Sequence, residues 1–184
     1  MEVSQMVTLG MWEQDSMLLQ LPQKGLAKRC QENPGKNIET IFDLVEMRDD
    51  ERHAFCNRFP NIDLSYEVIG SDNVRTGENV TLLITLDRKT QVEPVDAPRY
   101  PKAKDEGWWL VIGETISNQL VAIKRVSIQR KAKVKLEFAA PTKAAEKTYT
   151  LYFMCDSYLG CDLEYCFTVD VKEATGLGED SGSE

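Results

Sequence analysis

The sequence predicts an α+β protein in two parts: a short N-terminal helical region over residues 1–60 and a seven-stranded β-sandwich over residues 61–174. Apolar residues recur at helical spacing before Pro60 and alternate with polar residues after it, which is the period of a half-buried strand. No helical segment interrupts the alternating ones. The strands are therefore expected to pair antiparallel, in two sheets packed face to face.

Two helices are expected within residues 1–60. The segment Gln23–Glu32 has the composition of a short helix, and Asn33-Pro34-Gly35 would stop it. A second, amphipathic helix is expected over Asn37–Asp50, with Asn37 as its N-cap. The apolar face of this second helix would carry Ile38, Ile41, Phe42 and Val45.

Seven alternating segments define the expected strands, which are residues 62–68, 80–86, 108–112, 120–128, 134–138, 149–153 and 167–171. The alternation in 120–128 slips by one residue near Lys124 and Arg125, so a bulge is expected there. The proline-rich stretch 91–106 shows no alternation and is expected to cross between the sheets. The Gly, Ser and acid tail, 175–184, is expected to be disordered.

Trp108 and Trp109 are adjacent, so on a strand their side chains face opposite ways. One of them is expected in the core of the sandwich. The other needs a cover, for which we expect the chain's own helices.

Composition and missing motifs exclude several kinds of function. With 22 basic and 30 acidic residues the net charge is −8, which disfavours coating nucleic acid or an anionic membrane with the whole surface. No apolar run approaches the roughly 20 residues needed to span a bilayer, and no basic residue marks a secretory leader at the N-terminus. The single histidine, His53, has no visible catalytic partner, and no phosphate-binding loop is present. No cofactor, metal or small-molecule substrate is therefore expected.

The five cysteines are expected to be free thiols rather than zinc ligands. None of Cys30, Cys56, Cys155, Cys161 and Cys166 is spaced as C-x-x-C, and His53 is far from the last three in sequence.

A basic segment is the feature that points to a binding surface. Residues 99–137 hold nine basic and four acidic side chains, a charge of +5 in a chain of −8. Lys131, Lys133 and Lys135 share one strand face, because side chains repeat every second residue. Together with Lys124, Arg125 and Arg130 they are candidates for contact with an acidic partner or an RNA backbone. The alternatives are an ordinary solvated strand face and lysines that block edge pairing.

Five strings carry a family resemblance: MWEQDSMLLQLP (11–22), CNRFPNIDLSYEV (56–68), EGWWLVIG (106–113), IKRVSIQRKAKVKLEFAAP (123–141) and TLYFMCDSYLGCDLEY (150–165). They resemble the C-terminal part of the large U5 snRNP spliceosomal DExH-box RNA helicases, especially the plant ones. The resemblance implies the module shared with the translocon component of the endoplasmic reticulum: a helical bundle, a helix–loop–helix and an immunoglobulin-like or fibronectin-like sandwich. It also implies spliceosomal proteins as partners, and the nucleus as the location.

This chain departs from the family in two ways. The phosphate loop, DExH box and winged helix of the helicases have no counterpart, so their ATP hydrolysis does not carry over. In addition, about one helix is missing where DDERHAFCNRFP (49–60) joins two segments directly. A helical hairpin needs both members to bury its apolar stripe, so residues 1–60 are expected to be loosely packed, with Phe42, Leu44 or Phe55 exposed.

The sequence thus favours a non-catalytic interaction module from the C-terminus of a splicing helicase, as a truncated paralogue or gene fragment. A subunit associated with the translocon of the endoplasmic reticulum is the first alternative. An RNA-dependent ATPase in its own right is the second.

Overall fold

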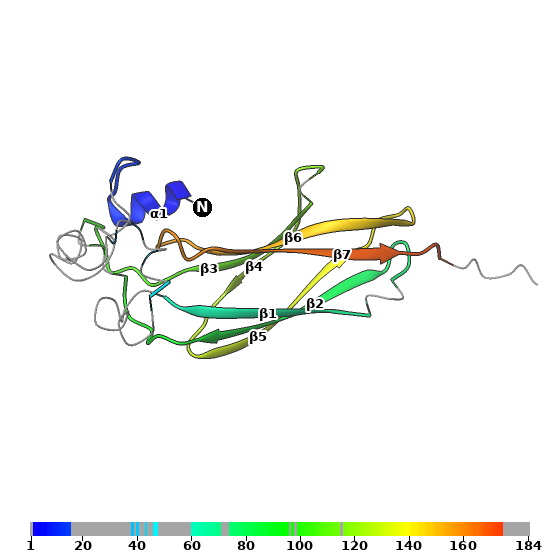
Figure 1. The fold of residues 1–184 in the computed structure, drawn as a ribbon, viewed down its shortest axis with the longest axis horizontal. Coiled ribbons are helices and arrows are strands. Elements are labelled where there is room, and N and C mark those ends of the chain that lie inside the picture. The colour runs from blue at the N-terminus through cyan, green and yellow to red at the C-terminus, as the bar shows by residue number, and fades with distance from the viewer. Residues whose placement is uncertain are drawn as a thin grey trace, which may run out of the picture.

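The computed structural model describes residues 2–15, 38, 40, 43, 46, 47, 60–70, 74–95, 97, 99–114 and 116–174. One helix precedes seven strands (Figure 1): α1 (Glu2–Leu9), β1 (Ile62–Ile69), β2 (Asn79–Arg88), β3 (Trp108–Glu114), β4 (Gln119–Val126), β5 (Lys131–Ala139), β6 (Ala145–Cys155) and β7 (Leu163–Val171). The expected fold class is confirmed. The expected helix 23–32, most of the helix 37–50, the side chains of Phe42, Leu44 and Phe55, and the tail 175–184 lie outside the described residues.

The strands form two layers (Figure 1). One sheet has the order β1-β2-β5 and the other β4-β3-β6-β7, and every pairing within them is antiparallel. In a constant-type immunoglobulin domain the fourth strand joins the sheet of the first two. Here β4 joins β3 instead, which is the fibronectin-like arrangement.

The core lies between the layers and follows the expected alternation. The inward positions of β2, which are Val80, Leu82, Ile84 and Leu86, are fully buried. Trp108 of β3 stacks on Phe153 of β6, with ring centroids 4.6 Å apart. Burying one such large side chain stabilises the fold by about 1.5–3 kcal/mol. Outside β4, the alternation of the strands therefore identifies the core correctly.

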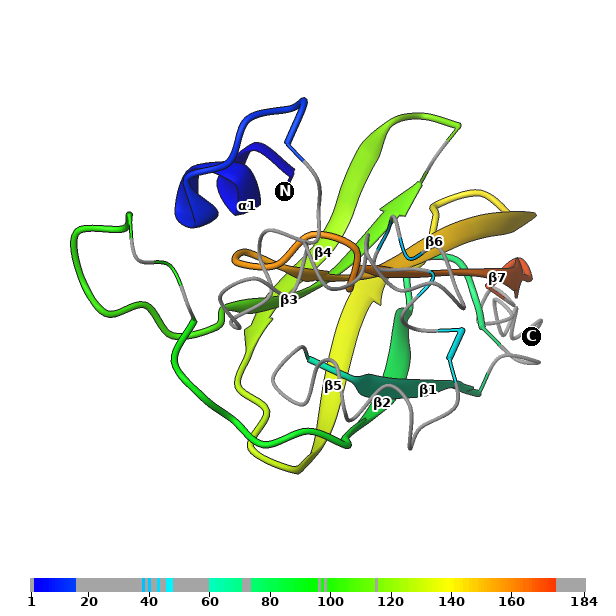
Figure 2. The same ribbon diagram turned by 60° about the vertical axis from the view of Figure 1, so that its left-hand side comes forward.

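A long connection carries the chain from β2 in one sheet to β3 in the other, as expected for residues 91–106 (Figure 2, green loop at the left). It is held by local backbone bonds, for example from Val95 N–H to the Lys104 carbonyl at 2.9 Å. Val95 itself packs into the core.

At each lateral side of the sandwich, where the edge strands of the two sheets face each other, a side chain of one sheet donates a hydrogen bond to a backbone carbonyl of the other. On one side the Tyr66 hydroxyl of β1 donates to the Cys166 carbonyl of β7 at 3.1 Å. On the other side the Lys124 ammonium of β4 donates to the Lys135 carbonyl of β5 at 3.1 Å. Each bond satisfies an acceptor on an edge strand, where carbonyls otherwise lack partners.

The bulge lies at a different place from the one expected. The register between β3 and β4 shifts between Ile112, opposite Ala122, and Gly113, opposite Leu120, so Val121 is the extra residue. No bulge occurs near Lys124 and Arg125. Lys124 takes an inward position opposite Leu110, and its side chain extends to β5 instead of entering the core. Ile123, which the alternation assigned to the core, is 54% exposed on the outer face.

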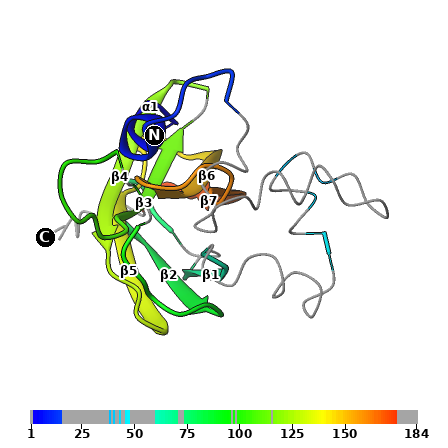
Figure 3. The same cartoon turned by 90° about the vertical axis from the view of Figure 1, so that its left-hand side faces the viewer.

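Helix α1 is docked on the sandwich, whereas the sequence predicted loose packing for residues 1–60; the prediction is wrong for α1, and most of residues 16–59 lie outside the described residues. It lies on the outer side of the four-stranded sheet, near the start of β3 (Figures 1 and 3). Leu9 joins the core, and the Gln5 amide donates to the Cys155 carbonyl at 2.7 Å. The difference arises because the end of the sheet offers unpaired backbone acceptors that a helix can satisfy.

Thr40 and Asp43 exchange hydrogen bonds. The Thr40 N–H donates to an Asp43 carboxylate oxygen at 2.7 Å, and the Asp43 N–H donates back to the Thr40 hydroxyl at 3.3 Å. This reciprocal pair is the geometry of a capping box. It lies three residues after Asn37, the N-cap that the sequence predicts, which lies outside the described residues.

Candidate interaction surface

The three lysines of β5 share one face, as expected, and point away from the core. Lys131, Lys133 and Lys135 alternate with the buried Val134 and Leu136. Their cross-strand neighbours on β2 are Asp87 opposite Lys131, Thr85 opposite Lys133 and Leu83 opposite Lys135.

Acidic residues from neighbouring strands balance these lysines. The outer face of the β1-β2-β5 sheet and its end carry four cationic and four anionic side chains, so the net charge is 4 − 4 = 0: Lys89, Lys131, Lys133 and Lys135 against Asp63, Glu67, Asp87 and Glu137. Ion pairs join Lys135 to Glu137 at 2.7 Å, Lys131 to Asp87 at 3.6 Å and Lys89 to Asp87 at 2.8 Å. A hydrogen bond from Lys89 lowers the pKa of Asp87, and one from Lys135 lowers the pKa of Glu137. The face is a mixed, charge-balanced surface.

The other three candidates lie elsewhere. Lys124 spans the opening between the sheets. Arg125 lies on the outer face of the other sheet, with its guanidinium carbon 5.8 Å from the centre of the Trp109 ring. Arg130 is exposed in the β4–β5 turn, where its carbonyl accepts a bond from the Arg88 N–H at 2.7 Å. The six candidates therefore do not form one cluster.

The outer face of β3, β4 and the C-terminal part of β6 carries an apolar patch that the sequence did not reveal. Cross-strand pairing places Ile123 and Tyr152 beside Val111, and Met154 and Arg125 beside Trp109. Leu120 lies opposite Gly113. Leu120 and Ile123 are 63% and 54% exposed, whereas Trp109, Val111, Tyr152 and Met154 are half-buried. The missed signal was the phase of β4: Ile123 and Arg125 face outward in regular register, and the bulge at Val121 brings Leu120 to the same face.

The helices that the sequence predicts as the cover of Trp109 lie mostly outside the described residues, so this cover stays a prediction. The structure places Trp108 in the core and Trp109 on the outer face. There the guanidinium of Arg125, from the neighbouring strand, lies over the Trp109 ring. Such a cation–π contact contributes about 0.5–1 kcal/mol at an exposed site.

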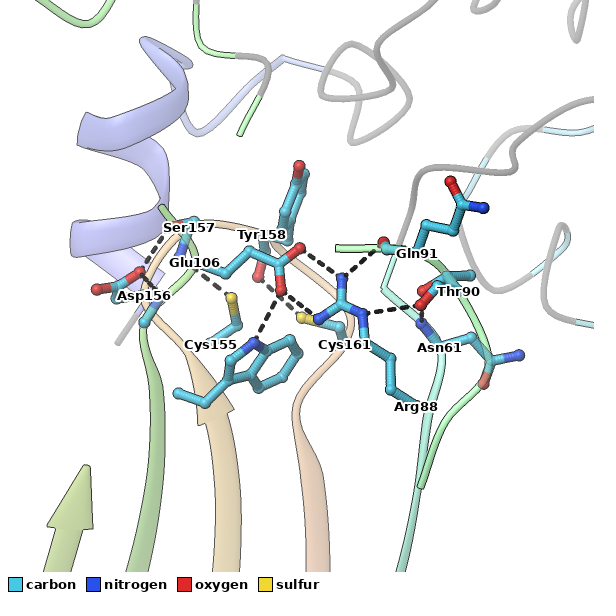
Figure 4. Close-up of polar contacts among 12 residues, drawn as sticks. Asn61, Arg88, Thr90, Gln91, Glu106, Cys155, Asp156, Ser157, Tyr158 and Cys161 are labelled. Atoms are coloured by element: carbon cyan, nitrogen blue, oxygen red, sulfur yellow. Dashed lines mark hydrogen bonds and ion pairs between the residues drawn. The ribbon is translucent and has the colours of Figure 1, made fainter. Parts of the chain in front are cut away.

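A buried ion pair organises the end of the sandwich below α1 (Figure 4). Arg88 and Glu106 form two short hydrogen bonds of 2.6 and 2.7 Å, and their side chains are 0% and 4% exposed. The indole N–H of Trp108 donates to the same carboxylate at 2.9 Å. The remaining guanidinium bonds go to the Thr90 and Gln91 carbonyls at 3.1 and 3.3 Å. This network fixes the long connection against the core and leaves no free group for catalysis in it.

A second polar cluster centres on Asp156, in the loop between β6 and β7. Its carboxylate accepts from the Ser157 hydroxyl at 2.5 Å, the Lys104 ammonium at 2.9 Å and the Gly107 N–H at 2.9 Å. Burial alone would raise the pKa of Asp156, but these hydrogen bonds outweigh it and lower the pKa. A Cβ on residue 107 would overlap this carboxylate, which explains the glycine there.

The described cysteines are free thiols. Cys155 is buried, Cys161 is half-buried and Cys166 is exposed. A hydrogen bond with the Cys155 thiol and burial raise the pKa of Cys161 well above its ordinary value, so it stays protonated. Among the described residues no three His, Cys, Asp or Glu side chains are placed to share a metal ion, and no helix is long and apolar enough to cross a membrane.

Comparison with known proteins identifies the family and the relatives to which this chain is similar. The family model of the Sec63 Brl domain matches residues 1–168. The Arabidopsis thaliana DExH-box ATP-dependent RNA helicase DExH13 is 66% identical over 194 residues, covering 95% of this chain and 9% of that protein. Its counterpart DExH12 is 64% identical over 199 residues, covering 97% and 9%. The Homo sapiens U5 small nuclear ribonucleoprotein 200 kDa helicase is 50% identical over 191 residues, covering 95% and 9%.

These relatives are much longer than the chain, which spans 9% of each. Among solved structures, the CARDB domain of a Pyrococcus furiosus protein aligns with a TM-score of 0.38 and 16% identity, over 62% of this chain and 90% of that one. The resemblance read from the five sequence strings is confirmed. The chain belongs to the Sec63 Brl domain family and is related to the U5-type DExH-box RNA helicases.

Proposed function

We propose that this chain is a non-catalytic protein-interaction module linked to pre-mRNA splicing. The observation that carries the proposal is the 50–66% identity to U5-type helicases across 95% of the chain. The proposed partners are spliceosomal proteins and the proposed location is the nucleus. The proposed module has a helical part over 1–60 and a sandwich over 61–174.

The chemistry of the described residues supports a binding role. Their buried polar clusters, Arg88–Glu106 and Asp156, have their hydrogen bonds made within the protein, whereas a catalytic centre needs groups directed at a substrate. Contact between RNA and Lys124, Arg125, Arg130, Lys131, Lys133 or Lys135 stays a prediction. The charge balance around the three β5 lysines favours a protein partner over a phosphate backbone.

The direct test is recovery of the U5 snRNP by the tagged chain from nuclear extract treated with ribonuclease. We expect U5 proteins to be enriched over a tagged, unrelated fibronectin-like domain. The purified chain should also show no ATP turnover above buffer, with or without RNA. Enrichment of translocon proteins from microsomes, in place of U5 proteins, would favour the alternative role at the endoplasmic reticulum.

A further inference from the structure

We propose that the outer face of the four-stranded sheet docks an acidic, apolar segment of another protein. The β3–β4–β6 face consists of Trp109, Val111, Leu120, Ile123, Tyr152 and Met154, with Arg125 at one end. The inference deepens the proposed function and rests on it, because it names the surface and the chemistry of the partner.

The two outer faces of the sandwich differ sharply. The β1-β2-β5 face presents Lys, Asp, Glu, Ser and Thr in a charge-balanced mixture with only Leu83 and Ile69 as large apolar residues among the described ones, which is typical of a solvated surface. The β3–β4–β6 face presents six large apolar or aromatic side chains, and polar residues border it on the β7 side, where Thr150 lies opposite Gly113 and Glu164 opposite Tyr152. On the face that does not meet the core, polar residues would be expected if it were only solvated.

The composition of the face matches that of interface centres. Aromatic residues, Met and Arg are enriched there, while Lys, Glu and Asp are depleted. Trp, Tyr and Arg are also the residues whose removal costs most binding energy. Leu120 and Ile123, at 63% and 54% exposed, are the positions that a partner would desolvate.

Arg125 supplies the charge complementarity. Its guanidinium lies over Trp109, and among the described residues no carboxylate forms an ion pair with it. A guanidinium has five N–H donors, so one that lies over a ring and makes no ion pair can still donate two of them to a carboxylate. The preceding residue, Lys124, points to the other side of the strand, where it donates to the Lys135 carbonyl. One cation beside a large apolar area suits a peptide carboxylate better than a nucleic acid, which needs several phosphate contacts.

The first experiment identifies the protein segment that contacts the β3–β4–β6 face. In one variant of the full chain, a photo-cross-linking amino acid replaces Ile123. In a matched control variant it replaces Lys133, on the opposite face of the sandwich. Both variants are irradiated in nuclear extract. We expect position 123 to yield one sequenced peptide from another protein, with apolar side chains and an Asp or Glu, at much higher yield than position 133. Cross-links mainly to RNA, to a second copy of this chain or to its own residues would overturn the inference, as would equal yields or none at position 123.

The second experiment measures the contact with that peptide, made synthetically and labelled. We expect Ile123→Asp and Arg125→Glu each to weaken binding about tenfold or more, while the control Lys133→Glu stays within about twofold. A peptide with its acidic residue changed to Arg should bind the Arg125→Glu chain better than the original chain. All variants are checked by thermal unfolding, since their positions are exposed and the fold should be kept. Equal affinity for Ile123→Asp and the original chain would overturn the inference.

The two proposals fail differently. If the original chain and Ile123→Asp recover U5 proteins equally well, the docking face is wrong and the splicing module stands. If the original chain recovers none, the proposed function fails, whatever the second experiment gives.

Discussion

At the scale of single residues, a buried ion pair at one end of the sandwich makes stability depend on individual polar groups. The Arg88–Glu106 pair is almost fully buried and makes two hydrogen bonds, and Trp108 adds a third to the same carboxylate. A buried pair of this kind adds little over an apolar pair of equal volume, but losing one member leaves an uncompensated charge. The network therefore makes the fold sensitive to single substitutions.

Glu106→Gln is expected to lower the free energy of unfolding by about 3 kcal/mol, because the Arg88 guanidinium would stay buried without a counter-charge. Urea unfolding at neutral pH measures this. The control Lys89→Gln removes ion pairs in which the lysine is 47% exposed, and no measurable change is expected from it. A Glu106→Gln chain as stable as the original would show that the pair is open to water.

Two carboxylates of the β6–β7 loop respond to pH in opposite directions. The pKa of Asp156 is below its ordinary value of 3.8, so its stabilising contribution is present above pH 3.8 and is lost as the pH falls through the folded-state pKa. Burial raises the pKa of Asp162 above 3.8, despite hydrogen bonds from the Cys155 N–H and Gln5. The contribution of Asp162 is therefore present below pH 3.8 and is lost as the pH rises through its folded-state pKa.

Asp156→Asn should therefore remove part of the loss of stability on acidification, and Asp162→Asn part of the loss on raising the pH. Urea unfolding of both variants and the original chain between about pH 3 and pH 7 measures the slopes. Parallel curves for all three chains would show that neither carboxylate differs between the folded and unfolded states.

At the scale of elements, α1 is held by bonds to the sandwich more than by its own length. It has eight residues, and isolated helices of fewer than about 12 are marginal in water. Gln5 and Thr8 are buried and donate to the Cys155 and Asp156 carbonyls, and Leu9 enters the core. Docking, rather than propensity, explains why the helix forms here.

Gln5→Ala is expected to destabilise the fold by about 1–3 kcal/mol, since the buried Cys155 carbonyl would lose its Gln5 donor. Hydrogen exchange of residues 6–11 should become faster in this variant, because the helix would detach first. Ser4→Ala, at an exposed position of the same helix, serves as the control and should leave both readouts unchanged. If the two variants behave alike, the amide contact does not hold the helix.

At the scale of the whole molecule, the sandwich holds nearly all of the described core. The 25 buried residues of that core cluster include one from α1, Leu9, and the others lie between Ile62 and Val171. Two sheets with closed openings form a complete hydrophobic unit. This supports the proposed domain boundary near residue 60.

A fragment of residues 60–174 is therefore expected to unfold in one cooperative transition. Its free energy of unfolding should be about 3 kcal/mol below that of the full chain, because the burial of Leu9 and the bond from Gln5 are lost. Denaturant unfolding followed by tryptophan fluorescence checks this, since Trp108 and Trp109 lie in the fragment. A fragment without a transition would place the domain boundary before α1.

Much of this fold follows from local pattern. The strands and the core positions Val80–Leu86, Trp108 and Phe153 could be predicted because every second side chain of a strand points to the same layer. The family, too, could be recognised from short strings. These features depend on neighbours in the chain, which a sequence displays directly.

The surfaces required the tertiary structure, because they depend on residues far apart in the chain. Lys131, Lys133 and Lys135 look like a basic stripe until Asp63, Glu67 and Asp87 are placed on strands beside them. Ile123 seems to be a core residue until the register shows that Lys124 and Val126 are the inward residues of this strand, which leaves Ile123 on the outer face. The alternation of apolar and polar residues shows which side chains share one side of a strand. Only the register between neighbouring strands decides which charged side chains lie next to each other and which side of the strand faces water.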